Sequence, residues 1–291
     1  MRNSGLWLVV LAASVIPAFA QVTAEVRLDQ DQFLIGESLP VTVRITNRSG
    51  QALALGAEAD WLTFSIESRD GFVVGKNAEV PVVGEFQLES SKAALKHVDV
   101  TPYFSLTSPG RYTITASLKI KSWDRQIDSP AASFNVIQGA KFWEQDFGVP
   151  AAAGQTNGRP EVRKYVLQQA NFTRGRLRLY LRLTDESGAK TFRVQPIGPL
   201  VSFSRVEPQI DKFSNLHVLY ADGPRSYSYN ILNSEAEIVA RESFEFVDTR
   251  PRLSVNPDGK ISVSGGVRRL TAKDLPASTA SPADDLPQSK P

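Results

Sequence analysis

The chain contains no cysteine, and this absence excludes several classes of protein. Its 291 residues include no Cys, one Met and two His. Disulfides therefore cannot hold the fold, an acylated cysteine cannot anchor the protein, and the usual Cys and His ligands of structural zinc sites are missing or scarce. The stability of such a chain has to come from buried apolar cores.

Long apolar runs are also scarce, and the one that is present lies at the start of the chain. Arg2 precedes an apolar stretch from Leu6 to Ile16, and Pro17 and the ending Ala18-Phe19-Ala20 follow it. The stretch is shorter than the roughly 20 residues that a membrane helix needs. This pattern predicts a signal peptide cleaved after Ala20, and a periplasmic or secreted protein with no membrane span after cleavage.

The remaining sequence is rich in turn formers and in alternating apolar residues, which together favour strands over helices. It contains 19 Gly and 18 Pro. The segment from Val22 to Leu28 places an apolar residue at every second position, the period of a half-buried strand. The same alternation recurs from Leu39 to Ile45 and from Thr113 to Ile120. We therefore expect an all-β protein.

Changes in composition divide the chain into segments. Small and polar residues dominate from Ala151 to Gly158, and the chain after Thr271 has almost no large apolar residue. We predict a signal peptide over residues 1–20, a β-sandwich over 21–138, a linker over 139–160, an antiparallel β-domain over 161–270 and a disordered tail over 271–291.

Two groups of residues in the first domain resemble bacterial immunoglobulin-like β-sandwich domains. The front group is Phe33 with Gly36-Glu37 and the run to Asn47, and the back group is Leu106, Pro109-Gly110 and Tyr112. The resemblance implies a two-sheet sandwich with a tyrosine corner, in which the hydroxyl of Tyr112 bonds to backbone a few residues upstream. These motifs are structural and imply no particular function.

The second domain repeats a hairpin unit. The offset from Leu177 to Leu216 is 39 residues and from Leu216 to Ile261 it is 45 residues, which matches one four-stranded β-propeller blade. The segment from Glu207 to Tyr220 resembles the blades of sialidase-type propellers. The resemblance implies blade-like hairpins only, because about two and a half units are present and propellers close with at least four. A small open sheet or a sandwich is the alternative.

Charge differs between the two halves of the chain. From Val22 to Gln138 there are 11 Lys and Arg against 14 Asp and Glu, and from Glu161 to Leu270 there are 17 against 12. A basic excess of this size favours an anionic partner weakly. Four arginines at even spacing share one face of a predicted strand and are a candidate binding face for an anionic polysaccharide: Arg174, Arg176, Arg178 and Arg182. The alternative is the solvated face of an antiparallel sheet.

Two tryptophans are candidate exposed contacts to a sugar or a protein. Trp123 lies in a predicted hairpin tip, and Trp143 lies near the predicted linker. Packing between the two domains is the alternative for both residues.

Motifs of catalytic and metal sites are missing from the sequence. His97 and His217 stand in strand-like runs without zinc-ligand spacing, and there is no nucleophile elbow, phosphate-binding loop or calcium loop. Glu235 and Glu237 would serve glycoside hydrolysis only if a cleft brought suitable acids about 5 to 10 Å apart. We expect no enzyme, no metal site and no cofactor.

The sequence thus predicts a non-catalytic exported binding or assembly protein of the bacterial envelope or secretome. A protein is the expected partner, a glycan or anionic polysaccharide is the second choice, and no nucleic acid is expected. One alternative is a protease-inhibitor-like regulator, because the front of the first domain resembles the intracellular proteinase inhibitor family of bacilli. A loop from Asp70 to Pro81 would be its probe. Another alternative is a carbohydrate-binding module or carbohydrate-active enzyme built on the second domain.

Overall fold

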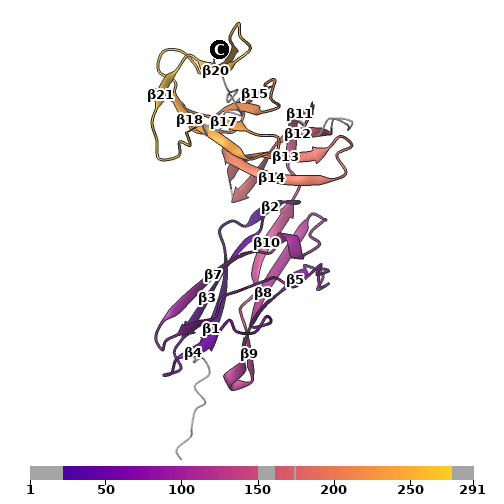
Figure 1. The fold of residues 1–291 in the computed structure, drawn as a ribbon, viewed down its shortest axis with the longest axis vertical. Helices are drawn as coiled ribbons and strands as arrows, with labels where there is room; N and C mark the ends of the chain where they lie inside the picture. The colour runs from indigo at the N-terminus through magenta and orange to yellow at the C-terminus, as the bar shows by residue number, and fades with distance from the viewer. Residues whose placement is uncertain (1–21, 150–160, 174, 277–291) are drawn as a thin grey trace, which may run out of the picture.

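The protein folds into two β-structured domains that follow one another along the chain (Figure 1). The computed structural model describes residues 22–149, 161–173 and 175–276, so the predicted signal peptide lies outside the described residues. Within them, the helices are the 3-10 turns η1 (Thr101–Tyr103) and η2 (Lys121–Trp123). No helix there is long and apolar enough to cross a membrane. The expectation of an all-β protein is confirmed.

The first domain is a sandwich of two main sheets. One sheet has the strand order β1-β3-β7, and the other has the order β2-β10-β8-β5 with β9 beside β8. A short pair, β4-β6, accompanies them. The strands are β1 (Val22–Leu28), β2 (Gln32–Leu34), β3 (Pro40–Asn47), β4 (Leu53–Leu55), β5 (Leu62–Ser68), β6 (Phe86–Leu88), β7 (Ala93–Asp99), β8 (Gly110–Ile120), β9 (Arg125–Asp128) and β10 (Ala132–Ile137).

Alternation along the strands builds the core of this domain. In β1, Val22, Ala24 and Val26 are buried while the residues between them are exposed. The apolar faces of both sheets turn inward and form one continuous core, in which the side chains of Ile66 and Ile114 are fully buried. The two-residue period of the sequence therefore decides which face of each sheet is covered.

The hydrogen bond predicted for Tyr112 is present. Its hydroxyl donates to the backbone carbonyl of Ser108 at 2.8 Å, and its ring stacks on Phe134 with 5.7 Å between ring centroids. Phe134 in turn meets Phe33 edge-on at 5.9 Å. These contacts fix the start of β8 against β10 and β2.

The second domain contains two larger antiparallel sheets and a hairpin. The sheet orders are β11-β12-β13-β14 and β15-β16-β17-β18-β21. Neighbouring strands follow one another in the chain except for β18 and β21, between which the chain forms the hairpin β19-β20. The strands are β11 (Ala140–Gly148), β12 (Val162–Thr173), β13 (Arg176–Asp185), β14 (Thr191–Pro199), β15 (Glu207–Ile210), β16 (Leu216–Ala221), β17 (Ser226–Leu232), β18 (Ile238–Glu245), β19 (Arg252–Val255), β20 (Ile261–Ser264) and β21 (Val267–Arg269).

Three layers are stacked in the second domain. The two larger sheets share one core, to which Leu181 of β13 and Val218 of β16 belong. On the opposite face of the sheet containing β16, the hairpin packs Leu253 and Val263 against a smaller cluster that includes Tyr229. Covered on both faces, β16 is buried along its whole length.

Two predicted boundaries differ from the structure. Part of the range predicted as a linker, residues 139–160, is the strand β11. Only Phe147 of this edge strand is buried, stacked on Tyr165 at 3.9 Å between centroids, so the strand carries no alternation that marks it in the sequence. In the predicted tail, Leu275 exchanges two backbone hydrogen bonds with Arg241, at 2.9 and 3.0 Å. Residues 150–160 and 277–291 lie outside the described residues.

A small contact joins the two domains beneath β14 (Figure 1). Its apolar part comprises Leu34 and Ile137 of the first domain and Ala170, Tyr180 and Val194 of the second. Beside it, Arg178 donates to the side chain of Gln30 at 2.8 Å, and Gln30 donates to Glu37 at 2.9 Å. Burial raises the pKa of Glu37, although hydrogen bonds from Leu34 and Gln30 oppose the shift.

Candidate functional site

The loop between β15 and β16 is built around Asp211. Its Oδ1 atom accepts the backbone N–H groups of Phe213 at 2.8 Å and Asn215 at 2.9 Å, and its Oδ2 atom accepts the Asn215 amide at 3.0 Å. An aspartate that bonds to the backbone two residues ahead forms an Asx turn. This turn leaves the ring of Phe213 63% exposed.

Beneath the loop lies His217 of β16, which is 5% exposed. Its Nε2 atom is 3.2 Å from Oδ2 of Asp211, and its Nδ1 atom is 2.6 Å from the hydroxyl of Tyr229. An ionised carboxylate only accepts hydrogen bonds, so we assign the proton to Nε2, and Nδ1 accepts from the tyrosine. Burial lowers the pKa of His217, although the hydrogen bond that it donates to Asp211 opposes the shift, and the imidazole is therefore neutral near pH 7.

The loop and the tip of the β19-β20 hairpin line an open pocket of about 370 Å³. Ile231 and Ile261 contribute its apolar lining, and Phe213 forms a wall. Lys212 and Lys260 lie on the two opposing loops. This volume falls within the roughly 300 to 1,000 Å³ of small-ligand sites.

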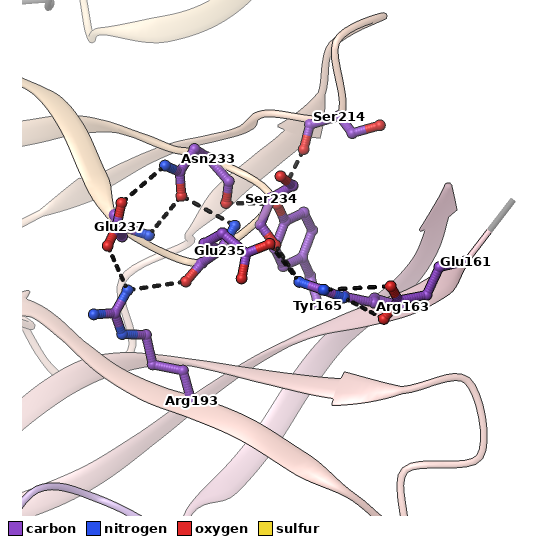
Figure 2. A network of polar contacts seen from close by, with 9 residues as sticks. All are labelled: Glu161, Arg163, Tyr165, Arg193, Ser214, Asn233, Ser234, Glu235 and Glu237. Atoms are coloured by element: carbon purple, nitrogen blue, oxygen red, sulfur yellow. Dashed lines mark hydrogen bonds and ion pairs between the residues drawn. The ribbon is translucent and has the colours of Figure 1, made fainter. Parts of the chain in front are cut away.

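A network of polar contacts anchors the loop to the neighbouring sheet (Figure 2). The hydroxyl of Tyr165, on β12, lies 3.0 Å from the carbonyl of Ser214 and 2.8 Å from that of Asn233. The hydroxyl of Ser214 donates to the carbonyl of Gly148 at 2.7 Å. These bonds hold the pocket's loop at a fixed position relative to β11 and β12.

Two arginines extend this network to the turn between β17 and β18 (Figure 2). Arg163 bonds to Glu235 at 2.7 Å, and Arg193 bonds to Glu237 at 3.1 Å. Asn233 closes the turn, because its side-chain oxygen accepts the N–H groups of Glu235 and Glu237. We call Arg163, Arg193, Asn233, Glu235 and Glu237 the arginine latch. It joins the two larger sheets of the second domain.

The chemistry of these groups suits the holding of a ligand. Both ring nitrogens of His217 are engaged, so the ring offers no lone pair to act as a base. Hydrogen bonds from Asn233 and Arg193 lower the pKa of Glu237, whereas glycoside hydrolysis requires a carboxylic acid with a raised pKa. Across residues 22–149, 161–173 and 175–276, no three His, Asp or Glu side chains gather in a group that could hold a metal ion.

The predicted arginine face comprises Arg174, Arg176, Arg178 and Arg182, and the structure places its members in different surroundings. Arg174 lies outside the described residues, and Arg176 is exposed. Arg178 reaches Gln30 at the domain contact, and Arg182 donates to the hydroxyl of Thr191 at 2.9 Å. The binding role of the row stays a prediction.

Both predicted aromatic contacts are partly buried. Trp123 lies in η2 and packs against the core of the first domain. Trp143 lies in β11 and packs against the core of the second domain. Each side chain thus contributes to its own domain, and a role in binding stays a prediction.

Sequence reasoning missed Phe213 and the partner of His217. Asp211 and Asn215 bracket the loop with turn-forming residues, and this signal was present in the sequence. The contact between His217 and Tyr229 follows from the antiparallel register of β16 and β17, in which Leu219 lies opposite Tyr229. No spacing in the sequence shows that register.

The loop predicted as an inhibitor probe, Asp70 to Pro81, begins along the edge of β5. Gly71 adopts φ 78° in a tight turn, and its N–H donates to the carbonyl of Ser68 at 2.9 Å. Directly after the turn, Phe72 and Val73 are 74% and 71% exposed. The loop therefore presents two adjacent apolar side chains to solvent.

The fold and the pocket define an all-β protein with a site of ligand size, and comparison with known proteins assigns it no family. No protein-family model matches the chain, and no curated protein matches its sequence. Among solved structures, the sporulation control protein Spo0M from Bacillus subtilis aligns with a TM-score of 0.30 and 9% identity, over 75% of this chain and 79% of that chain. A likeness at this score carries no argument about function.

Proposed function

We propose that this chain is a non-catalytic exported binding protein of the bacterial envelope or secretome, and that its pocket receives part of a protein partner. The observation that carries the proposal is the pocket itself, which is open and largely apolar and is walled by the exposed ring of Phe213. Export rests on the pattern of the first twenty residues.

Two features favour a protein as the partner. Exposed aromatic rings beside apolar pockets supply much of the binding energy at protein interfaces. The loop that carries Phe213 is held from both sides, by Asp211 and by the bonds of Ser214, so little conformational entropy is lost when a partner binds.

We also propose that the first domain is immunoglobulin-like and that the second consists of propeller-blade-like units. The tyrosine corner at Tyr112 and the pairing of β2 with the last strand, β10, support the first assignment. The second is supported by the two successive meanders, each of which begins with four consecutive strands, and by the incomplete third unit β19-β20.

Site-specific photocrosslinking in the host tests the partner and the site together. We would place a photoreactive phenylalanine analogue at position 213 and, as a matched control, at Leu95, which is 55% exposed on β7. A single dominant protein adduct at position 213 that is missing at position 95 is the expected result. Equal adducts at both positions, or none at position 213, would overturn the pocket as the docking site.

A protease-inhibitor-like regulator is the second candidate, favoured by the exposure of Phe72 directly after the Gly71 turn. Inhibitors of serine proteases present an exposed side chain on a fixed loop to the specificity pocket. Incubation of micromolar protein with chymotrypsin-like enzymes would show inhibition that is lost in Phe72→Ala and kept in Phe213→Ala. No inhibition across the panel would remove this candidate.

A further inference from the structure

A second cavity lies at the other end of the second domain, away from the pocket of Phe213. It has a volume of about 480 Å³. One wall is the turn between β16 and β17, the floor is formed by β17 and β18, and the opposite wall is β21 with the chain that follows it. We call this cavity the basic groove, after the side chains Arg225, Arg269 and Lys273 that line it.

The acidic side chains of the groove are already engaged. Glu245 accepts an ion pair from Arg269 at 2.7 Å, and Asp222 accepts a hydrogen bond from the hydroxyl of Ser226. Because Glu245 and Arg269 neutralise one another, the remaining charged heads of the lining are those of Asp222, Arg225 and Lys273.

Two cationic side chains, those of Arg225 and Lys273, line the groove and keep N–H donors that are unpaired in the part of the chain that the structure describes. Arg225 uses its Nε atom to donate to the carbonyl of Phe246 at 3.0 Å. Within the described residues, its two terminal nitrogens and the Nζ atom of Lys273 have no hydrogen-bond partner. The two heads belong to opposite walls, so an anion in the groove would be contacted from both sides.

Aromatic rings supply the apolar part of the floor. Tyr227 and Phe244 both line the groove. Tyr227 is only 8% exposed because it also belongs to the cluster beneath the β19-β20 hairpin, so the half-buried ring of Phe244 is the accessible one. The guanidinium of Arg250 lies 5.5 Å from the ring centre of Tyr227, and that of Arg268 lies 5.6 Å from the ring centre of Phe244. Arg268 is itself paired with Asp274 at 2.7 Å, so it is the guanidinium of Arg250 that adds to the positive potential at the floor.

We propose that the basic groove binds a carboxylated glycan, a chain of uronic acid residues. The apolar face of a pyranose ring packs on an aromatic floor, and a ring carboxylate forms paired hydrogen bonds with a guanidinium. Both chemistries are present in one groove. In the arginine row on β13, by contrast, only Arg176 is described as exposed to solvent. The inference goes beyond the proposed protein partner and uses different residues.

Binding to an oligogalacturonate, measured by calorimetry on the purified protein, tests the proposal. Arg225→Gln and Lys273→Gln should each weaken binding about tenfold, because each removes a hydrogen bond to a charged group. Arg176→Gln is the matched control, since it removes an exposed cation outside the groove, and it should leave the Kd unchanged. The fully methyl-esterified oligomer, which lacks the charge, should not bind.

Three results would overturn the proposal. Equal binding of the charged and esterified oligomers would remove the role of the carboxylate. Loss of binding in Arg176→Gln but not in Arg225→Gln would transfer the site to β13. Tighter binding of an oligoglutamate than of the oligogalacturonate would make the occupant an acidic peptide. None of these results bears on crosslinking at position 213, so the two proposals fail separately.

Discussion

The two domains are both built from antiparallel sheets, yet they hold their interiors by different means. The first has one continuous apolar core. The second divides its apolar residues among smaller clusters and also buries polar side chains, among them His217 and Asn230. It then joins its two larger sheets by the arginine latch. The alternating strands of the first domain fill a single apolar core, whereas the three layers of the second domain form separate cores.

This difference teaches where each domain is vulnerable. Apolar burial responds to the volume of a side chain and little to salt or pH. Buried hydrogen bonds and ion pairs respond to both, because their strength depends on charge. The first domain should therefore be sensitive mainly to cavities, with Glu37 as a buried titratable group at the domain contact, and the second to the charge state of a few groups.

The largest effect is expected from a cavity in the first domain. Ile114→Ala removes a fully buried side chain from the middle of β8 and should lower the free energy of unfolding by about 2 to 5 kcal/mol. Urea titration with amide hydrogen exchange as the readout would report the free energy of unfolding of each domain separately. Leu95→Ala, at a side chain that is 55% exposed, is the control and should cost less than about 1 kcal/mol. An equal loss in both variants would contradict a core centred on β8.

A smaller effect is expected from opening the arginine latch. The side chain of Arg163 is only 12% exposed, and Arg163→Met should destabilise the second domain by about 1 to 2 kcal/mol, because the bonds of this guanidinium to Glu235 and to the carbonyl of Ser234 are lost. High salt should shrink the difference. The control is Arg27→Met, whose pair with Glu25 is about half exposed on both sides, so water and salt screen it and its loss should leave the stability nearly unchanged. A latch variant as stable as this control would show that apolar packing alone joins the sheets.

The smallest effect is a dependence on pH with opposite signs in the two domains. Burial lowers the pKa of His217 below 6.5, so the unfolded state takes up a proton first, and the second domain loses stability as the pH falls below about 6.5. Burial raises the pKa of Glu37 above 4.5, so the first domain loses stability as the pH rises through the folded pKa of that group. One proton changes the free energy of unfolding by at most about 1.4 kcal/mol per pH unit.

Urea titrations between pH 4 and 8 with His217→Gln and Glu37→Gln would measure these two contributions. Each variant should flatten the curve of its own domain and leave the other unchanged. A second domain whose stability rises as the pH falls from 6.5 would contradict a histidine that is buried in its neutral form.

Strands with one face in solvent could be predicted from the sequence, because their alternation of apolar and polar residues is a local pattern. The alternation in β1, β3 and β8 is visible residue by residue, and the hydroxyl of Tyr112 bonds only four residues upstream. Edge strand β11 has no such pattern, since both of its faces are largely exposed. The row on β13 looked uniform in sequence, but its neighbours come from distant segments, Gln30 for Arg178 and Thr191 for Arg182.

The sequence by itself determined the β class of this protein, the inward faces of its alternating strands and the charge difference between its halves. Period and composition carry that information within a few residues. Only the tertiary structure decided that Asp211, His217 and Tyr229 form one chain of hydrogen bonds and that Arg225 and Lys273 face one groove. Those groups meet through strand register and layer packing, which depend on contacts between residues far apart in the chain.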